Sequence, residues 1–243
     1  MNFLSLLTKM FVVALLGSAL SSAAAGDSPN PPLRLEFTLA IVDGQIPSTV
    51  FFTDEKGSPV SVTLNSATRS QVYKYSGPPR MLLWSNGAGN VRVPVAVVRF
   101  TADLKRALVL LVSNPPPVVG QPSHLALAVE DGLQIAPRGS LRILNMSGGS
   151  LAMELAGQQS RLEPGPSPVY NVGRDASTPP VLMRLARIQG EDLRMIFQGN
   201  INASPQERIT MIVLSGATPD DVPRFRILRE SIREEKPVSK SSK

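Results

Sequence analysis

The chain has 243 residues, no cysteine and a formal net charge of +6. The absence of cysteine from the sequence excludes disulfides, thiolate metal ligands and cysteine nucleophiles, so each module must be held together by apolar burial. Half of the excess charge, +3, lies on the three lysines Lys236, Lys240 and Lys243 near the C-terminus. We therefore expect no nucleic-acid binding, because neither half of the chain has a net basic field able to neutralise many phosphates.

The first 25 residues have the pattern of a secretory signal peptide. Lys9 precedes the apolar stretch Met10–Leu20, and the small residues Ala23–Ala25 follow. A positive start, a short apolar core and an A-x-A-like end are typical of export signals. This core is shorter than the roughly 20 apolar residues that span a membrane. We predict a mature chain that begins at Gly26, carries no transmembrane segment and is exported to the periplasm or the extracellular space.

Short apolar runs, separated by turn residues, fill the first half of the mature chain. Proline and glycine total 40 residues (22 plus 18), and they end strands and build turns, which favours an all-β fold. The Val60–Leu64 run alternates apolar and hydroxyl side chains, as a half-buried strand does. The Ala107–Val112 run is apolar throughout, which predicts a central strand covered on both faces. The predicted strands are Leu33–Val42, Val50–Thr53, Val60–Leu64, Val72–Tyr75, Met81–Trp84, Val93–Phe100, Ala107–Val112 and Leu125–Val129.

The second half repeats the order of the first half. The matched segments are Leu33–Leu35 with Leu141–Ile143, Val72-Tyr73 with Val169-Tyr170, Lys105–Ser113 with Glu207–Ser215, and Pro122–Leu127 with Pro223–Leu228. Their offsets are 108, 97, 102 and about 100 residues, and they drift as loop insertions would make them drift.

The repeat predicts two tandem immunoglobulin-like β-sandwich modules after the cleaved signal peptide, since about 100 residues with some seven strands suit that fold. We place the modules at residues 33–135 and 138–232, and a disordered basic tail at 233–243. Residues 223–232 carry a competing pattern, because an acidic cap and spaced apolar residues also suit a helix. The repeat favours a strand there.

The residues that carry common catalytic chemistry are sparse. His124 is the only histidine of the sequence, which rules out a site built from several imidazoles, and we interpret it as an exposed residue at a strand end. The adjacent acids, Glu130-Asp131 among them, lie beside turns, where solvated carboxylates are expected. The glycine-containing segment Ser85–Asn90 suits a hairpin turn better than a phosphate loop. We predict no enzyme activity, no metal site and no cofactor.

Three aromatic residues form a candidate sugar-binding surface. Tyr73 and Tyr75 have the same parity on one predicted strand, and Trp84 lies on a nearby strand. Sugars stack on exposed aromatic rings, so these three could form a platform for a glycan. The competing interpretation is that Trp84 fills the core of the first module and the tyrosines cover a sheet edge, because aromatic side chains mostly pack.

Two resemblances bear on function. The segments Leu141–Ser147 and Arg161–Gly165 resemble a strand and a Pro-Gly turn of uncharacterised exported bacterial β-sandwich proteins. That resemblance implies a fold and a location, without an activity. The architecture as a whole is similar to that of periplasmic pilus chaperones, which donate a strand to an incomplete subunit. This similarity implies that Leu125, Leu127 and Val129 could present such a strand.

These observations favour a non-catalytic extracytoplasmic protein that binds or scaffolds an envelope protein or glycan. A carbohydrate- or cell-wall-binding module is the first alternative, and a strand-donating periplasmic chaperone is the second.

Overall fold

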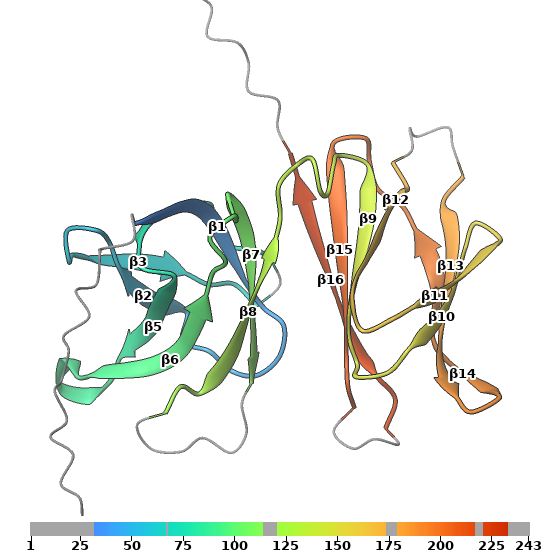
Figure 1. Cartoon of the computed structure of the whole chain (residues 1–243). Helices are drawn as coiled ribbons and strands as arrows, with labels where there is room; N and C mark the ends of the chain where they lie inside the picture. The colour runs from blue at the N-terminus through green and yellow to red at the C-terminus, as the bar shows by residue number, and fades with distance from the viewer. Residues whose placement is uncertain (1–31, 67, 114–120, 174–178, 217–220, 233–243) are drawn as a thin grey trace, which may run out of the picture. The chain divides into compact units, whose positions relative to one another are not determined.

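The computed structural model describes residues 32–66, 68–113, 121–173, 179–216 and 221–232. The predicted signal peptide and the basic tail lie outside these residues. The described chain is all-β, with four four-stranded sheets in two tandem sandwich-like modules, which confirms the predicted fold class (Figure 1). Both modules belong to one compact unit that starts at Pro32.

The first module has two sheets. One sheet has the strand order β4-β1-β7-β8 and the other has the order β3-β2-β5-β6. All eight predicted strands are present in the described chain: β1 (Leu33–Ile41), β2 (Thr49–Thr53), β3 (Pro59–Thr63), β4 (Tyr73–Gly77), β5 (Arg80–Asn86), β6 (Arg92–Arg99), β7 (Arg106–Ser113) and β8 (His124–Glu130). A single 3-10 turn at Ala88–Asn90 connects β5 to β6, so the glycine-containing segment is the hairpin turn expected from the sequence.

The second module repeats this arrangement strand for strand. Its sheets have the orders β12-β9-β15-β16 and β11-β10-β13-β14. The strands are β9 (Ser140–Met146), β10 (Leu151–Leu155), β11 (Gln158–Leu162), β12 (Gly165–Asn171), β13 (Val181–Gln189), β14 (Asp192–Ile201), β15 (Glu207–Leu214) and β16 (Arg224–Ser231). The segment near residue 225 is therefore a strand, as the repeat predicted, and not a helix.

The strand pairings make the correspondence of the modules explicit. The first strand of each module pairs in parallel with the seventh, through Glu36 with Arg106 in module 1 and Ser140 with Arg208 in module 2. Arg106 and Arg208 thus correspond at the predicted offset of 102 residues. Glu36 corresponds to Ser140 at an offset of 104 (140 minus 36), which corrects our sequence match of β1 with β9 by four residues. This even correction keeps the same side chains on the same face of the sheet.

Each sandwich is filled by residues that alternate along its strands. In β3, Val62 is fully buried while Ser61 and Thr63 are exposed, as the alternating pattern predicted. In β7, Ala107–Leu111 are fully buried on both faces of the sheet. Ala107, Val109 and Leu111 point into the core of module 1, whereas Leu108 and Leu110 belong to a separate apolar cluster.

That separate cluster joins the two modules. Module 1 contributes Ala40, Val42, Leu108 and Leu110, and module 2 contributes Leu144, Ile212, Leu214 and Leu228. The strands β1 and β7 and their counterparts β9 and β15 therefore carry apolar side chains on both faces along part of their length, because one face fills a sandwich and part of the other fills the junction.

Candidate functional site

The predicted aromatic residues are not brought together as an exposed platform. Tyr73, Tyr75 and Trp84 are 8%, 4% and 3% exposed. The tyrosine rings lie between the sheets of module 1 and pack against Phe37 and Phe52. Burial raises the pKa of Tyr75, whose hydroxyl donates a 2.7 Å hydrogen bond to a backbone carbonyl. These rings stabilise the core, because large aromatic surfaces gain most when they are removed from water.

Trp84 is one of the buried residues of the core cluster of module 1, as the competing interpretation expected. It pairs across the strands with Phe51, so the two side chains lie on the same face of their sheet. The indole ring is covered there by Phe51, at 6.2 Å between ring centroids, and by the guanidinium carbon of Arg92, 4.6 Å from the ring centroid. A stacked ring and a cation over the indole face together account for its low exposure.

His124 is buried at the start of β8, which corrects our expectation of an exposed residue. Its side chain is 5% exposed, and its Nδ1 lies 2.8 Å from the hydroxyl of Ser123. Burial lowers the pKa of His124, and nearby Asp43 partly opposes that effect. The Asp43 carboxylate accepts bonds from Ser113 and from both terminal nitrogens of Arg224. This arrangement gives the imidazole no oriented carboxylate of the kind that a catalytic triad uses.

Asp131 was expected to be a solvated turn residue, and it is instead fully buried at the junction of the modules. Its carboxylate accepts hydrogen bonds from Arg69 at 2.6 Å, from Arg142 at 2.9 Å and from Arg208 at 2.6 Å. Arg208 and Arg142 belong to module 2, whereas Arg69 and Asp131 belong to module 1. A single carboxylate just after β8 therefore bonds to the loop that carries Arg69 in module 1 and to the strands β9 and β15 of module 2.

Glu230 completes this buried ionic junction. It pairs with Arg208 at 2.6 Å, with Arg69 at 3.0 Å and with Arg106 at 3.4 Å. Burial lowers the pKa of Arg69 and of Arg142, and the charge of Asp131 raises the pKa of each in part. Four guanidiniums thus face two carboxylates in a place from which water is largely excluded. Removal of any one partner would leave an uncompensated charge in this buried place, which is strongly destabilising.

Sequence reasoning missed this junction, although its components occupy matched positions of the repeat. Arg106 and Arg208 correspond, and the strand registers pair Arg208 with Glu230 while the backbone of Arg106 meets that of Asp131. The available signal was a charged residue within an apolar run in each module, for example Arg142 in Leu141–Leu144.

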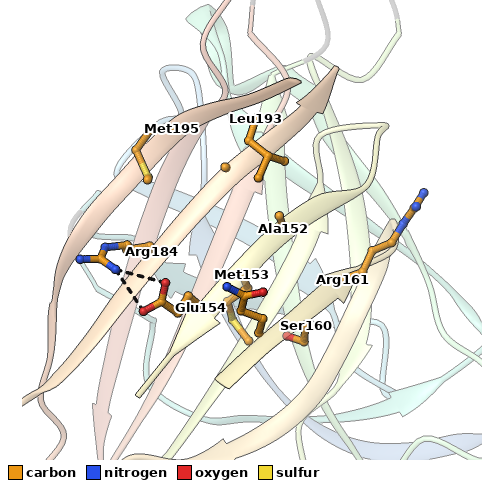
Figure 2. Close-up of a pocket in the computed structure, with 10 residues that line it drawn as sticks. Ala152, Met153, Glu154, Ser160, Arg161, Arg184, Leu193 and Met195 are labelled. Atoms are coloured by element: carbon orange, nitrogen blue, oxygen red, sulfur yellow. Dashed lines mark hydrogen bonds and ion pairs between the residues drawn. The ribbon is translucent and has the colours of Figure 1, made fainter. Parts of the chain in front are cut away.

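The outer face of the second module carries a groove that we regard as the candidate binding site. Its volume is about 350 Å³, and it crosses the strands β10, β11, β13 and β14 (Figure 2). Ala152 and Ala186, which are paired across β10 and β13, are the small residues at its centre. Leu193 and Met195 line it from β14 and are 64% and 50% exposed. Exposed apolar side chains around a small-residue centre are typical of a contact surface.

The charged residues that line the groove are already paired. The guanidinium of Arg184 donates to both carboxylate oxygens of Glu154, at 3.1 Å each (Figure 2). Arg161 pairs with Glu163 at 2.7 Å, and the hydroxyl of Ser150 donates to the same carboxylate at 2.6 Å. That hydrogen bond is the main cause that lowers the pKa of Glu163. The groove therefore combines an apolar part, to which Leu193 and Met195 belong, with charged side chains that already have ion-pair partners.

A second hollow, on module 1, has a different character. It has a volume of about 550 Å³ and lies over β1 and β4, where four basic and three acidic residues alternate around it. Mixed charges in open solvent provide little net field, so this hollow offers no comparable basis for selecting a ligand.

Comparison with known proteins assigns no class to this chain. No protein-family model matches it, and no curated protein matches it significantly. Among the described residues, no group of three or more histidine, aspartate or glutamate side chains could hold a metal ion. The same residues include no helix that is long and apolar enough to span a membrane.

Proposed function

We propose that this chain is a non-catalytic extracytoplasmic protein that binds or scaffolds a protein of the cell envelope. The observation that carries the proposal is the apolar groove on the outer face of module 2. Two exposed apolar side chains, Leu193 and Met195, flank it at positions where a solvated sheet face normally carries polar residues. The secretory pattern of the first 25 residues supports the extracytoplasmic location.

The environment of the reactive side chains supports a non-catalytic role. His124 is buried beside Ser123, and Asp131 is neutralised by three guanidiniums. The ionic junction supports a scaffolding role, because a binding face on a unit of fixed geometry loses less conformational freedom when a partner docks.

A strand-donating chaperone is the second candidate, and one observation favours it. β8 is an edge strand in the described chain, and its alternate residues Leu125 and Leu127 are 59% and 41% exposed. An extended edge with regularly spaced apolar side chains suits addition of a partner strand. Val129 is the third residue of this series, and it packs into the cluster between the modules.

The carbohydrate-binding alternative loses its basis, because Tyr73 and Tyr75 lie in the core and Trp84 is covered by Phe51 and Arg92.

The proposal is tested by affinity capture. The tagged mature chain, residues 26–243, is incubated with an envelope extract of its own source, and bound proteins are identified by mass spectrometry. We expect a stoichiometric partner that is lost with Met195→Asp in the groove and retained with Leu125→Asp on β8. The reverse pattern would favour the chaperone. A turnover that is abolished by His124→Asn would overturn the non-catalytic assignment.

A further inference from the structure

The strand registers of the sheets β3-β2-β5-β6 and β11-β10-β13-β14 can be aligned residue by residue, because both sheets carry the same irregularity. The pairing of β5 with β6 shifts between Leu83 and Trp84, where the extra residue lies on β6. The pairing of β13 with β14 shifts between Leu185 and Ala186, with the extra residue on β14. A β-bulge is a fixed landmark of a sheet, so Trp84 and Ala186 are equivalent positions.

The row of residues across each sheet then follows from the strand registers. In module 1 the row is Ser61, Phe51, Trp84 and Pro94. In module 2 the equivalent row is Arg161, Ala152, Ala186 and Met195. The same alignment makes Arg92 of β6 equivalent to Leu193 of β14, since these residues lie two positions before Pro94 and Met195 on their strands.

The same place on the two modules is therefore filled in one and open in the other. In module 1 the phenyl ring of Phe51 and the indole of Trp84 stack at 6.2 Å, and Arg92 covers the indole. In module 2 two alanines stand at these positions, and the groove of about 350 Å³ lies above them. That volume is within the range of small-ligand pockets.

We propose that this groove binds a planar aromatic ring, namely a tryptophan or tyrosine side chain of an extended segment of a partner protein. The proposal rests on the binding function proposed above and specifies what the groove recognises. The alanine methyls of Ala152 and Ala186 offer a flat apolar floor, and Met195 offers a thioether, which contacts aromatic rings favourably.

Charge complementarity and the position of β14 identify the occupant further. The charged residues that line the groove, Glu154, Arg161 and Arg184, all take part in ion pairs, so the groove matches an uncharged ring better than an anion. β14 is the end strand of its sheet in the described chain, and it directs Leu193 and Met195 toward the groove. Ala186 and Ala152 lie one and two strands in from β14, so a partner segment that crosses this face of the sheet can place one side chain over the two alanines.

The proposal is tested by methyl NMR on the mature chain, residues 26–243, labelled at alanine and methionine methyl groups. The probe is a capped heptapeptide of alternating threonine and valine with a central tryptophan, and the control peptide has alanine at the centre. We expect the methyl signals of Ala152, Ala186 and Met195 to shift with the tryptophan peptide. Its affinity should exceed that of the alanine peptide at least about tenfold, because only the tryptophan peptide buries a ring.

Variants locate the binding. The double variant Ala152→Phe with Ala186→Trp recreates the filled face of module 1, and it should abolish the response. Met195→Asp changes a half-exposed residue and should weaken binding without affecting folding, with Ala186 as the reporter signal. Leu182→Ala, on β13 outside the groove, is the matched control and should bind as the wild type does.

The outcomes separate this inference from the proposed function. Equal affinities for the two peptides, or binding that survives Met195→Asp, would overturn the aromatic site. If free indole bound as tightly as the tryptophan peptide, the groove would be a site for small aromatic molecules, and the inference that the ring belongs to a partner protein would be overturned. A captured envelope partner that the filled variant retains would overturn this inference while the binding function stands. If the tryptophan peptide bound but no envelope protein were captured, the aromatic site would stand and the proposed scaffolding function would be overturned.

Discussion

Neutralising Asp131 should destabilise the protein more than any other single loss of charge at the junction. The isosteric change Asp131→Asn removes the charge that three guanidiniums share, at distances of 2.6 to 2.9 Å. The carboxylate is 0% exposed and its arginine partners are at most 4% exposed, so water cannot replace it. Breaking a buried ion pair from one side costs about 3–5 kcal/mol. For a unit of this size that corresponds to a decrease in melting temperature of about 6–20 °C.

The assay is thermal unfolding of residues 26–243, followed by circular dichroism and calorimetry. The matched control is Asp43→Asn, which removes an ion pair between the modules that lies outside the ionic junction. Asp43 pairs with Arg224, whose side chain is 56% exposed, so its loss should cost only about 0–1 kcal/mol. The interpretation of the junction would be refuted if Asp131→Asn melted within about 2 °C of the wild type, or if the two variants were equally destabilised.

Three further results are expected. Burial lowers the pKa of His124 below its unfolded value, so the unfolded chain binds the proton more readily and the stability of the fold falls as the pH drops below about 6.5. The free energy of unfolding, measured between pH 7 and 5, should therefore depend less steeply on pH in His124→Asn than in the wild type. Trp84→Ala removes a covered indole and should cost about 3–5 kcal/mol in urea unfolding, and an unchanged midpoint would contradict the packing described. Gly44→Ala should be strongly destabilising, because the φ of Gly44 is +87° and an added Cβ would lie 2.7 Å from the Cβ of Ser113. Gly57 has a φ of +79° but open space around it, so Gly57→Ala should lower the free energy of unfolding by less in the same urea assay.

The strands of this fold could be predicted from local patterns. Alternation along Val60–Leu64 and the unbroken apolar run Ala107–Val112 each have a direct structural counterpart, in a half-exposed strand and a strand buried on both faces. The repeat was visible because equivalent strands keep their order. Its alignment was wrong by four residues at the first strand, since short apolar runs fit one another at several even offsets.

The junction and the groove could not be predicted in the same way, because both depend on pairing between distant strands. Asp131 reads as a turn acid until β15 brings Arg208 beside it from 77 residues away. Ala152 and Ala186 are unremarkable residues until the bulge in β13 and β14 aligns them with Phe51 and Trp84. Tyr73 and Tyr75 were candidates because of their residue type, and burial is what decides their role.

The parallel pairing of the first and seventh strands also determines how the polypeptide acquires its structure. Glu36 pairs with Arg106, which is 70 residues later in the chain (106 minus 36), and Ser140 pairs with Arg208, which is 68 residues later (208 minus 140). Contacts so distant in sequence slow the search for the native arrangement. Nearly a whole module must therefore emerge from the ribosome before its first strand can pair with its seventh. During that interval the core-facing side chains of β1 and β9, such as Phe37 and Leu141, remain exposed, and exposed apolar surface of this kind promotes aggregation.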